Sequence, residues 1–286
     1  MREKLSVELL KENLSFITNV TYSNVSSWYG ATRRDLHMDI IAPKNRENHA
    51  PCPAVVWFCG GAFRVMDRSV WMAEMIRYAE AGFIVAGAEY RTGNEAIFPA
   101  QLIDAKAAVR FLRAHAGEFC VDPEKIFAMG ESAGGAIACL LGVTGKKKEL
   151  DQGAYLDQDS SVCGVIDFYG LADMTISISE QEGDDIVPPW MLEEVLGVRY
   201  SREQAVSASA LYQVTSSVPP HMILHGTNDH TVPMEQSVAY YEKLVEQGVR
   251  ADLIEIERAQ HGDDLFCQNQ VKDKVIAFMR DIAGSW

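Results

Sequence analysis

Short apolar runs alternate with longer amphipathic stretches along most of the chain. The runs at 54–60 (AVVWFCG), 83–90 (FIVAGAEY) and 125–130 (KIFAMG) have the composition of buried strands. Between them, residues 71–82 and 97–117 repeat apolar positions at the spacing of an amphipathic helix. This alternation predicts an α/β protein with a mostly parallel central sheet and helices on both faces.

The same pattern continues to the end of the chain, and the beginning differs from it. Residues 16–23 and 36–43 look like antiparallel strands, which we expect at the edge of the sheet. Further strands and helices are predicted, in chain order, at 132–145 (helix), 161–170 (strand), 221–226 (strand), 235–248 (helix), 251–257 (strand) and 271–283 (helix).

One long region interrupts the alternation between Leu171 and Pro220. An acidic stretch, Glu180 to Asp185, is followed by two short helical patterns at 188–198 and 201–211. Long excursions in compact domains are usually functional or disordered, and this one has enough apolar residues to pack. We expect a helical cap insertion at about 171–220, over the carboxyl ends of the strands where ligands bind in open α/β sheets. The whole chain, 1–286, is then a single domain.

Composition and charge narrow the class of protein. The 286 residues are 48% hydrophobic, enough for one large core. Lys and Arg number 26 against 40 Asp and Glu, and the formal net charge of −14 disfavours nucleic acid and anionic membranes as partners. The charged N-terminal stretch lacks the apolar core of a signal peptide, so we expect a cytoplasmic protein. Six scattered cysteines predict reduced thiols, and the scattered histidines predict no metal site.

The stretch 129–137, MGESAGGAI, contains the candidate chemistry. Ser132 lies between Gly130 and Gly134 in a GxSxG pattern, where a predicted strand runs into a predicted helix. In that context the pattern is typical of a nucleophile elbow rather than of an ordinary glycine-rich turn. The glycines matter because side chains at their positions would collide with the neighbouring strand and helix.

A serine hydroxyl needs a histidine base and a carboxylate that orients the base. In the order typical of such elbows, the acid comes next in the chain and the histidine last. Asp229 and His261 each follow a predicted strand in that order. We therefore predict Ser132, Asp229 and His261 as a catalytic triad, with Asp263 and Asp264 as weaker candidates for the acid.

The reaction also needs hydrogen-bond donors for the negative charge that develops on the substrate oxygen. Residues 58–63, FCGGAF, follow an early predicted strand, and the glycines leave backbone that a substrate could approach. We assign this oxyanion hole to the backbone N–H groups of Gly61, Ala62 and Ala133. Four further residues are candidates for substrate binding or for support of the cap: Gly60, Phe63, Trp71 and Trp190.

Together these motifs resemble the α/β-hydrolase superfamily. Within it, the chain is most similar to carboxylesterases related to hormone-sensitive lipase and to the acetylxylan/feruloyl (BD-FAE-like) esterases. The resemblance covers roughly 53–262 and assigns Glu131 and the segment 89–91 structural rather than chemical roles. This sequence departs from the family pattern at two positions, because Cys59 replaces the histidine of HGGG and Ala62 replaces its third glycine.

The sequence thus predicts a serine carboxylesterase that hydrolyses short-acyl esters through an acyl-enzyme, without a metal or organic cofactor. The resemblance implies acetyl esters of sugars or oligosaccharides as substrates, and homodimers are common among such enzymes. A peptidase or lactonase would use the same groups. A non-catalytic small-molecule-binding protein is the alternative from another class, but in such a protein we would expect the serine or the late histidine to be missing.

Overall fold

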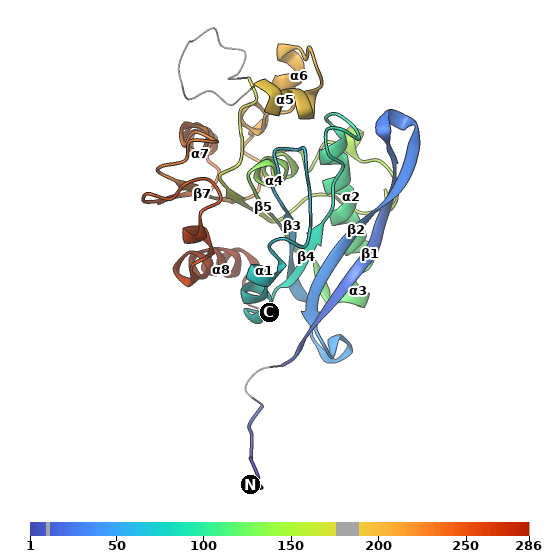
Figure 1. Ribbon diagram of the computed structural model, residues 1–286, viewed down its shortest axis with the longest axis vertical. Coiled ribbons are helices and arrows are strands. Elements are labelled where there is room, and N and C mark those ends of the chain that lie inside the picture. The colour runs from blue at the N-terminus through green and yellow to red at the C-terminus, as the bar shows by residue number, and fades with distance from the viewer. Residues whose placement is uncertain (10–11, 176–188, 286) are drawn as a thin grey trace.

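An eight-stranded sheet forms the centre of the molecule (Figure 1). The computed structural model describes residues 1–9, 12–175 and 189–285. The strands follow the spatial order β1-β2-β4-β3-β5-β6-β7-β8, and all pairs from β4 to β8 are parallel. The strands are β1 (Leu14–Ser27), β2 (Thr32–Pro43), β3 (Cys52–Phe58), β4 (Ile84–Ala88), β5 (Val121–Glu131), β6 (Gly164–Phe168), β7 (His221–Gly226) and β8 (Ala251–Ile256).

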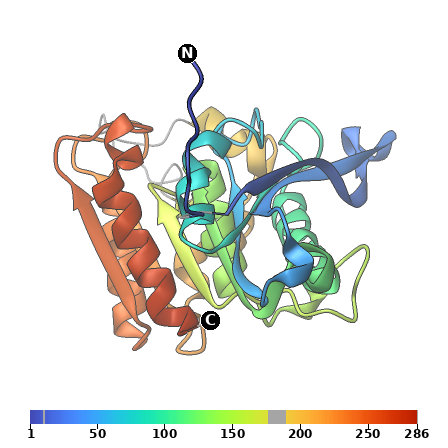
Figure 2. The same ribbon diagram turned by 90° about the horizontal axis from the view of Figure 1, so that it is seen from below.

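Helices cover both faces of this sheet (Figure 2). Helices α2, α4 and α7 pack on one face, and α1 and α8 pack on the other. The helices are α1 (Met72–Glu80), α2 (Ala100–Ala114), α3 (Ala116–Phe119), α4 (Ala133–Val143), α5 (Pro189–Leu196), α6 (Arg202–Ser207), α7 (Glu235–Glu246) and α8 (Asn269–Ala283). The mostly parallel α/β architecture predicted from the apolar pattern is therefore confirmed.

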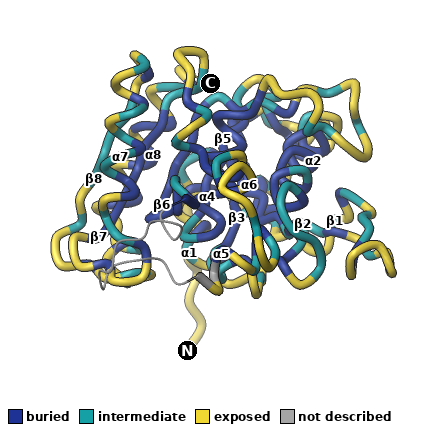
Figure 3. Tube along the Cα trace, turned by 90° about the horizontal axis from the view of Figure 1, so that it is seen from above, coloured by how far each residue is buried: buried dark blue, intermediate teal, exposed yellow. Residues whose placement is uncertain are grey.

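Successive side chains of β3 point to opposite faces of the sheet, and helices cover both faces. Ala54, Val56 and Phe58 contribute to the core under α2 and α4, whereas Val55 and Trp57 contribute to the core under α1 and α8. A parallel strand covered on both faces has no solvent side, so it reads as a continuous apolar run. Figure 3 shows the result, with buried central strands surrounded by more exposed loops and helix surfaces.

The edge strands lie where the sequence places them, and the two short helical patterns form helices. β1 and β2 pair antiparallel, and β2 joins the sheet antiparallel to β4. The patterns at 188–198 and 201–211 form α5 and α6, near the end of the sheet where β5 runs into α4 (Figure 1). The acidic stretch at 180–185 lies outside the described residues. Over the described part of the chain, no helix combines the length and the apolar character that crossing a membrane requires.

Candidate active site

The GxSxG stretch forms a sharp turn between β5 and α4. Ser132 stands alone between the two elements, with φ 54° and ψ −119°, a conformation that costs energy for a residue with a side chain. A Cβ atom on Gly130 would lie 2.3 Å from the carbonyl oxygen of Gly134, and one on Gly134 would lie 2.0 Å from that of Phe58. Both positions therefore require glycine, and the turn lifts the Ser132 side chain above the sheet.

The three residues predicted as a triad form one hydrogen-bonded row. His261 Nε2 lies 2.8 Å from Ser132 Oγ, and His261 Nδ1 lies 2.7 Å from Asp229 Oδ2. The loops after β7 and β8 carry the acid and the histidine to the edge where β5 ends. The weaker candidate Asp263 instead caps a short 3-10 helix by accepting the backbone N–H of Leu265 at 3.0 Å.

Asp229 is fully buried at its side chain and held on both oxygens. Its Oδ1 accepts the backbone N–H groups of Thr231 (2.8 Å) and Val232 (2.9 Å). Burial raises the pKa of Asp229, but hydrogen bonds from His225 and His261 outweigh burial and hold this pKa well below its usual value. Because an ionised carboxylate only accepts, His261 Nδ1 must carry a proton, which leaves the Nε2 lone pair of the neutral ring facing Ser132.

The loop after β3 starts beside this turn, since Phe58 and Gly130 are register partners on β3 and β5. Its backbone takes positive φ values at Gly61 (126°) and Ala62 (54°). A Cβ on Gly61 would lie 2.1 Å from the carbonyl oxygen of Val65, so only glycine fits there. Ala133 opens α4, and a first-turn N–H has no acceptor within its own helix.

Glu131 connects the elbow to the loop after β3. Its Oε1 accepts the backbone N–H of Gly60 and, at 3.2 Å, the indole Nε1–H of Trp71. Burial raises the pKa of Glu131, and the hydrogen bonds from Gly60 and Trp71 oppose that rise. The Gly60 amide is therefore engaged by the protein itself, and the Glu131 carboxylate serves as a brace rather than as an acid in the row of Ser132.

Two further contacts brace the loop where the family pattern has a histidine. The Tyr90 hydroxyl donates to the carbonyl oxygen of Cys59 at 2.7 Å, and the Gly93 N–H donates to that of Phe63 at 2.7 Å. Burial raises the pKa of the Cys59 thiol to about 12, so this cysteine is an inert, packed residue. The segment after β4 thus stabilises the loop without a histidine at position 59.

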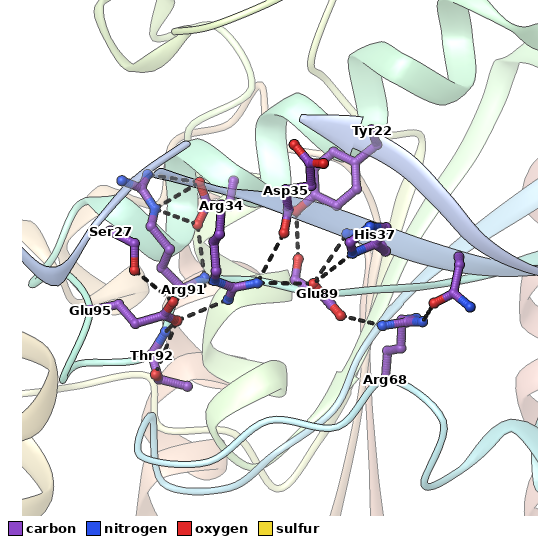
Figure 4. A network of polar contacts seen from close by, with 12 residues as sticks. Tyr22, Ser27, Arg34, Asp35, His37, Arg68, Glu89, Arg91, Thr92 and Glu95 are labelled. Atoms are coloured by element: carbon purple, nitrogen blue, oxygen red, sulfur yellow. Dashed lines mark hydrogen bonds and ion pairs between the residues drawn. The ribbon is translucent and has the colours of Figure 1, made fainter. Parts of the chain in front are cut away.

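A polar network behind this segment ties it to the β1–β2 hairpin (Figure 4). Arg34 on β2 lies 3.1 Å from Glu89 Oε2 through Nη1 and 2.9 Å from Glu95 Oε2 through Nη2. Arg91 pairs with the buried Asp104 of α2 at 2.7 Å. The residues 89–91 therefore have the structural role that the family resemblance implies.

The predicted substrate-binding residues fall into different environments. Phe63 is only 1% exposed and packs in the core. Trp71 borders a cavity of about 30 Å³ next to Glu131. Trp190 on α5 is 45% exposed, and the Arg64 guanidinium lies 5.6 Å from its ring centre. Arg64 follows the loop after β3, so this contact brings α5 to the same edge as the row of Ser132.

His225 lies within the buried strand β7, where the sequence gives no signal of a role at the site. The structure places its Nε2 3.3 Å from Asp229 Oδ2, directly behind the triad. No local pattern could show this contact, because an inward-facing histidine on a buried strand reads like any other core position.

Comparisons with known proteins support the fold. A solved truncated carbohydrate esterase from gut microbiota is 27% identical, with a TM-score of 0.79 over 98% of this chain and 99% of its own. The Est2 esterase of Thermogutta terrifontis is 26% identical, with a TM-score of 0.75 over 96% of this chain and 94% of its own. The chain therefore has the α/β-hydrolase fold.

Curated relatives point to the same group of proteins. A probable carboxylic ester hydrolase of Mycobacterium tuberculosis, LipM, is 27% identical over 89% of this chain and 59% of its own length. A probable isoprenylcysteine alpha-carbonyl methylesterase of Arabidopsis thaliana, ICMEL1, is 27% identical over 91% of this chain and 55% of its own. The chain thus spans little more than half the length of these relatives. The BD-FAE family model matches residues 38–244, well over half of the chain, which therefore belongs to the BD-FAE family.

Proposed function

We propose that the protein is a serine carboxylesterase that hydrolyses short-acyl esters. The observation that carries this proposal is the row of side chains in which His261 Nε2 lies 2.8 Å from Ser132 Oγ and Nδ1 lies 2.7 Å from Asp229. This arrangement meets the needs of a serine nucleophile, a general base and a group that orients the base. The similarity to proteins named as esterases supports the same reaction class.

In the proposed reaction, His261 Nε2 takes the hydroxyl proton while Ser132 Oγ attacks the ester carbonyl carbon. Asp229 holds the imidazole in the required tautomer and stabilises the imidazolium that forms. The tetrahedral intermediate collapses, the alkoxide leaves with the proton from His261, and an acyl-enzyme remains on Ser132. Water, deprotonated by the same nitrogen, then attacks the acyl-enzyme and releases the carboxylic acid.

The negative charge on the substrate oxygen would be stabilised by the backbone N–H groups of Gly61, Ala62 and Ala133. The positive φ values of Gly61 and Ala62 in the loop after β3, and the position of Ala133 at the start of α4, support this assignment. Such donors are fixed before the reaction starts, so they stabilise the transition state without reorganising.

We propose acetyl esters of sugars or oligosaccharides as the substrate class. The similarity to a protein named as a carbohydrate esterase supports this choice. A cap formed by 171–220, a single domain, a cytoplasmic location and a homodimer stay predictions.

Hydrolysis of p-nitrophenyl esters from acetate to decanoate tests the proposed activity. The wild type should turn over acetate fastest, with rates that fall as the acyl chain lengthens, and Ser132→Ala should lose turnover of every ester. Activity that persists in Ser132→Ala would show that another group is the nucleophile. Parallel assays with p-nitroanilides and lactones separate an esterase from a peptidase or lactonase, and no turnover at all would favour a binding protein.

A further inference from the structure

His225 is a buried histidine that has no part in the proposed proton transfers. It lies on β7, and its Nδ1 lies 2.6 Å from the hydroxyl of Ser237 on α7. Its Nε2 lies 2.8 Å from the carbonyl oxygen of Val232 and 3.3 Å from Asp229 Oδ2. The side chains of His225 and Asp229 are both 0% exposed, so no solvent competes for these contacts.

These contacts determine where the His225 ring carries its proton. Nε2 faces a carbonyl oxygen and an ionised carboxylate, and neither of them can donate. Nε2 therefore carries a hydrogen, which points to Val232 O at 2.8 Å, with Asp229 Oδ2 beside it at 3.3 Å. In the neutral ring Nδ1 is then an acceptor, and the Ser237 hydroxyl is the donor that fixes this tautomer.

The carboxylate of Asp229 is consequently held from two sides. Oδ2 faces N–H groups of both His225 and His261, while Oδ1 accepts two backbone N–H groups from Thr231 and Val232. Rotation of the carboxylate in either direction would break one of these contacts within a buried site, where unpaired polar groups are costly.

We propose that His225 is a positioning residue that keeps Asp229 Oδ2 turned toward His261, with Ser237 fixing the tautomer that His225 needs for this task. The proposal rests on the proposed function, because it assigns His225 a role in orienting the base for Ser132. Ser237 on α7 and His225 on β7 then extend the row of polar contacts from Asp229 into the core.

A core histidine without such a role is available on the same strand for comparison. His221 is also 0% exposed, and its ring contacts Pro219 O at 2.8 Å and the Tyr240 hydroxyl at 3.0 Å. Within the described part of the chain, neither of these two ring contacts involves a triad residue. His221→Leu and His225→Leu therefore remove the same buried ring from the same strand, and only the second removes a donor from Asp229.

The test compares kcat, KM and the proton-NMR resonance of His261 Nδ1–H in four variants. His225→Leu should lower kcat for p-nitrophenyl acetate by roughly 10–100-fold, with KM little changed. Loss of a group that orients a functional side chain typically reduces activity by this factor. His225→Gln, whose amide N–H can face Asp229, should restore most of kcat. Ser237→Ala should lower kcat by less than His225→Leu, and His221→Leu should keep the wild-type kcat at a temperature where it is folded.

The NMR resonance gives a readout that does not depend on turnover. It should shift or broaden in His225→Leu and remain as in the wild type in His221→Leu. Wild-type kcat and an unshifted resonance in His225→Leu would overturn the proposal, and so would an equal loss of kcat in His221→Leu. If His225→Leu does not fold, wild-type kcat in Ser237→Ala would overturn it. Equal turnover by the wild type and Ser132→Ala would instead contradict the proposed function, and the resonance alone would then decide the role of His225.

Discussion

At the residue scale, Glu131 links the nucleophile to the loop that is proposed to stabilise the oxyanion. It directly precedes Ser132, yet its carboxylate accepts hydrogen bonds from the Gly60 N–H and the Trp71 indole. The position of the loop therefore depends on a side chain of the elbow itself. In this protein Glu131 helps to support a loop that has cysteine in place of the usual histidine at position 59.

Removal of this brace should slow catalysis more than it weakens binding. Glu131→Ala leaves the Gly60 N–H without its acceptor and loosens the loop, so we expect kcat for p-nitrophenyl acetate to fall by roughly tenfold or more, on the scale of a weakened oxyanion donor. Glu74→Ala is the matched control, because Glu74 borders the same cavity but pairs with Lys272 on α8. An equal effect of both variants on kcat would contradict the role of the brace.

The elbow pattern and the chain order of acid and histidine lead from the sequence to Ser132, Asp229 and His261. The structure brings these three side chains into one hydrogen-bonded row. His225 could not be predicted as their neighbour, because its contact with Asp229 depends on how a loop folds back over its strand. The same limit applies to the hydrogen bond between Glu131 and Gly60.

At the element scale, the turn between β5 and α4 requires close approach of three backbone segments. Gly134→Ala places a methyl group 2.0 Å from the carbonyl oxygen of Phe58, which cannot move without disturbing β3. We expect the variant to unfold at least several degrees lower than the wild type, consistent with overpacking that costs about 1–3 kcal/mol or more. The variant should also lose esterase activity, because the added methyl group distorts the turn and displaces Ser132.

Gly117→Ala is the control for this substitution. A Cβ atom on Gly117, in α3, has no heavy atom within 4 Å. Thermal unfolding followed by circular dichroism should therefore give a melting temperature close to that of the wild type. A Gly134→Ala variant as stable and active as Gly117→Ala would contradict the proposed packing of the elbow.

The apolar pattern predicts the regular elements because each strand and long helix has its own periodicity. The strand at 221–226 is confirmed with the same bounds in β7, and the helix pattern at 235–248 is confirmed in α7. The four-residue helix α3 shows no such pattern, because one turn is too short for a repeat. The sequence also leaves open how α5 contacts the loop after β3, since an Arg64–Trp190 contact joins residues far apart in the chain.

At the scale of the whole molecule, a charged network connects the edge hairpin to the central sheet (Figure 4). Burial alone would raise the pKa of Glu95, but hydrogen bonds from Arg34, the Thr92 N–H and Ser27 outweigh it and lower this pKa from 4.5 to about 2. A carboxylate with a lowered pKa stabilises the folded state above its ordinary pKa. That contribution is lost as the pH falls through the lowered value.

Glu95→Gln should therefore reduce stability in a pH-dependent way. At pH 7 the variant should melt on the order of a few degrees below the wild type, and the difference should shrink between pH 4.5 and pH 2, where Glu95 itself takes up a proton. Glu246→Gln serves as the control, since Glu246 forms an exposed pair with Lys243 that contributes little. A difference for Glu95→Gln that stays constant across this range would contradict the assigned role of its charge.

Covalent labelling with a fluorophosphonate measures whether Ser132 is the nucleophile. Mass spectrometry of the intact wild type should show one adduct, and peptide mapping should locate it on Ser132, because only a serine activated by a base attacks phosphorus rapidly. His261→Ala should label far more slowly, and Ser132→Ala should not label at all. An adduct on another residue, or equal labelling of the wild type and Ser132→Ala, would contradict the proposed serine mechanism.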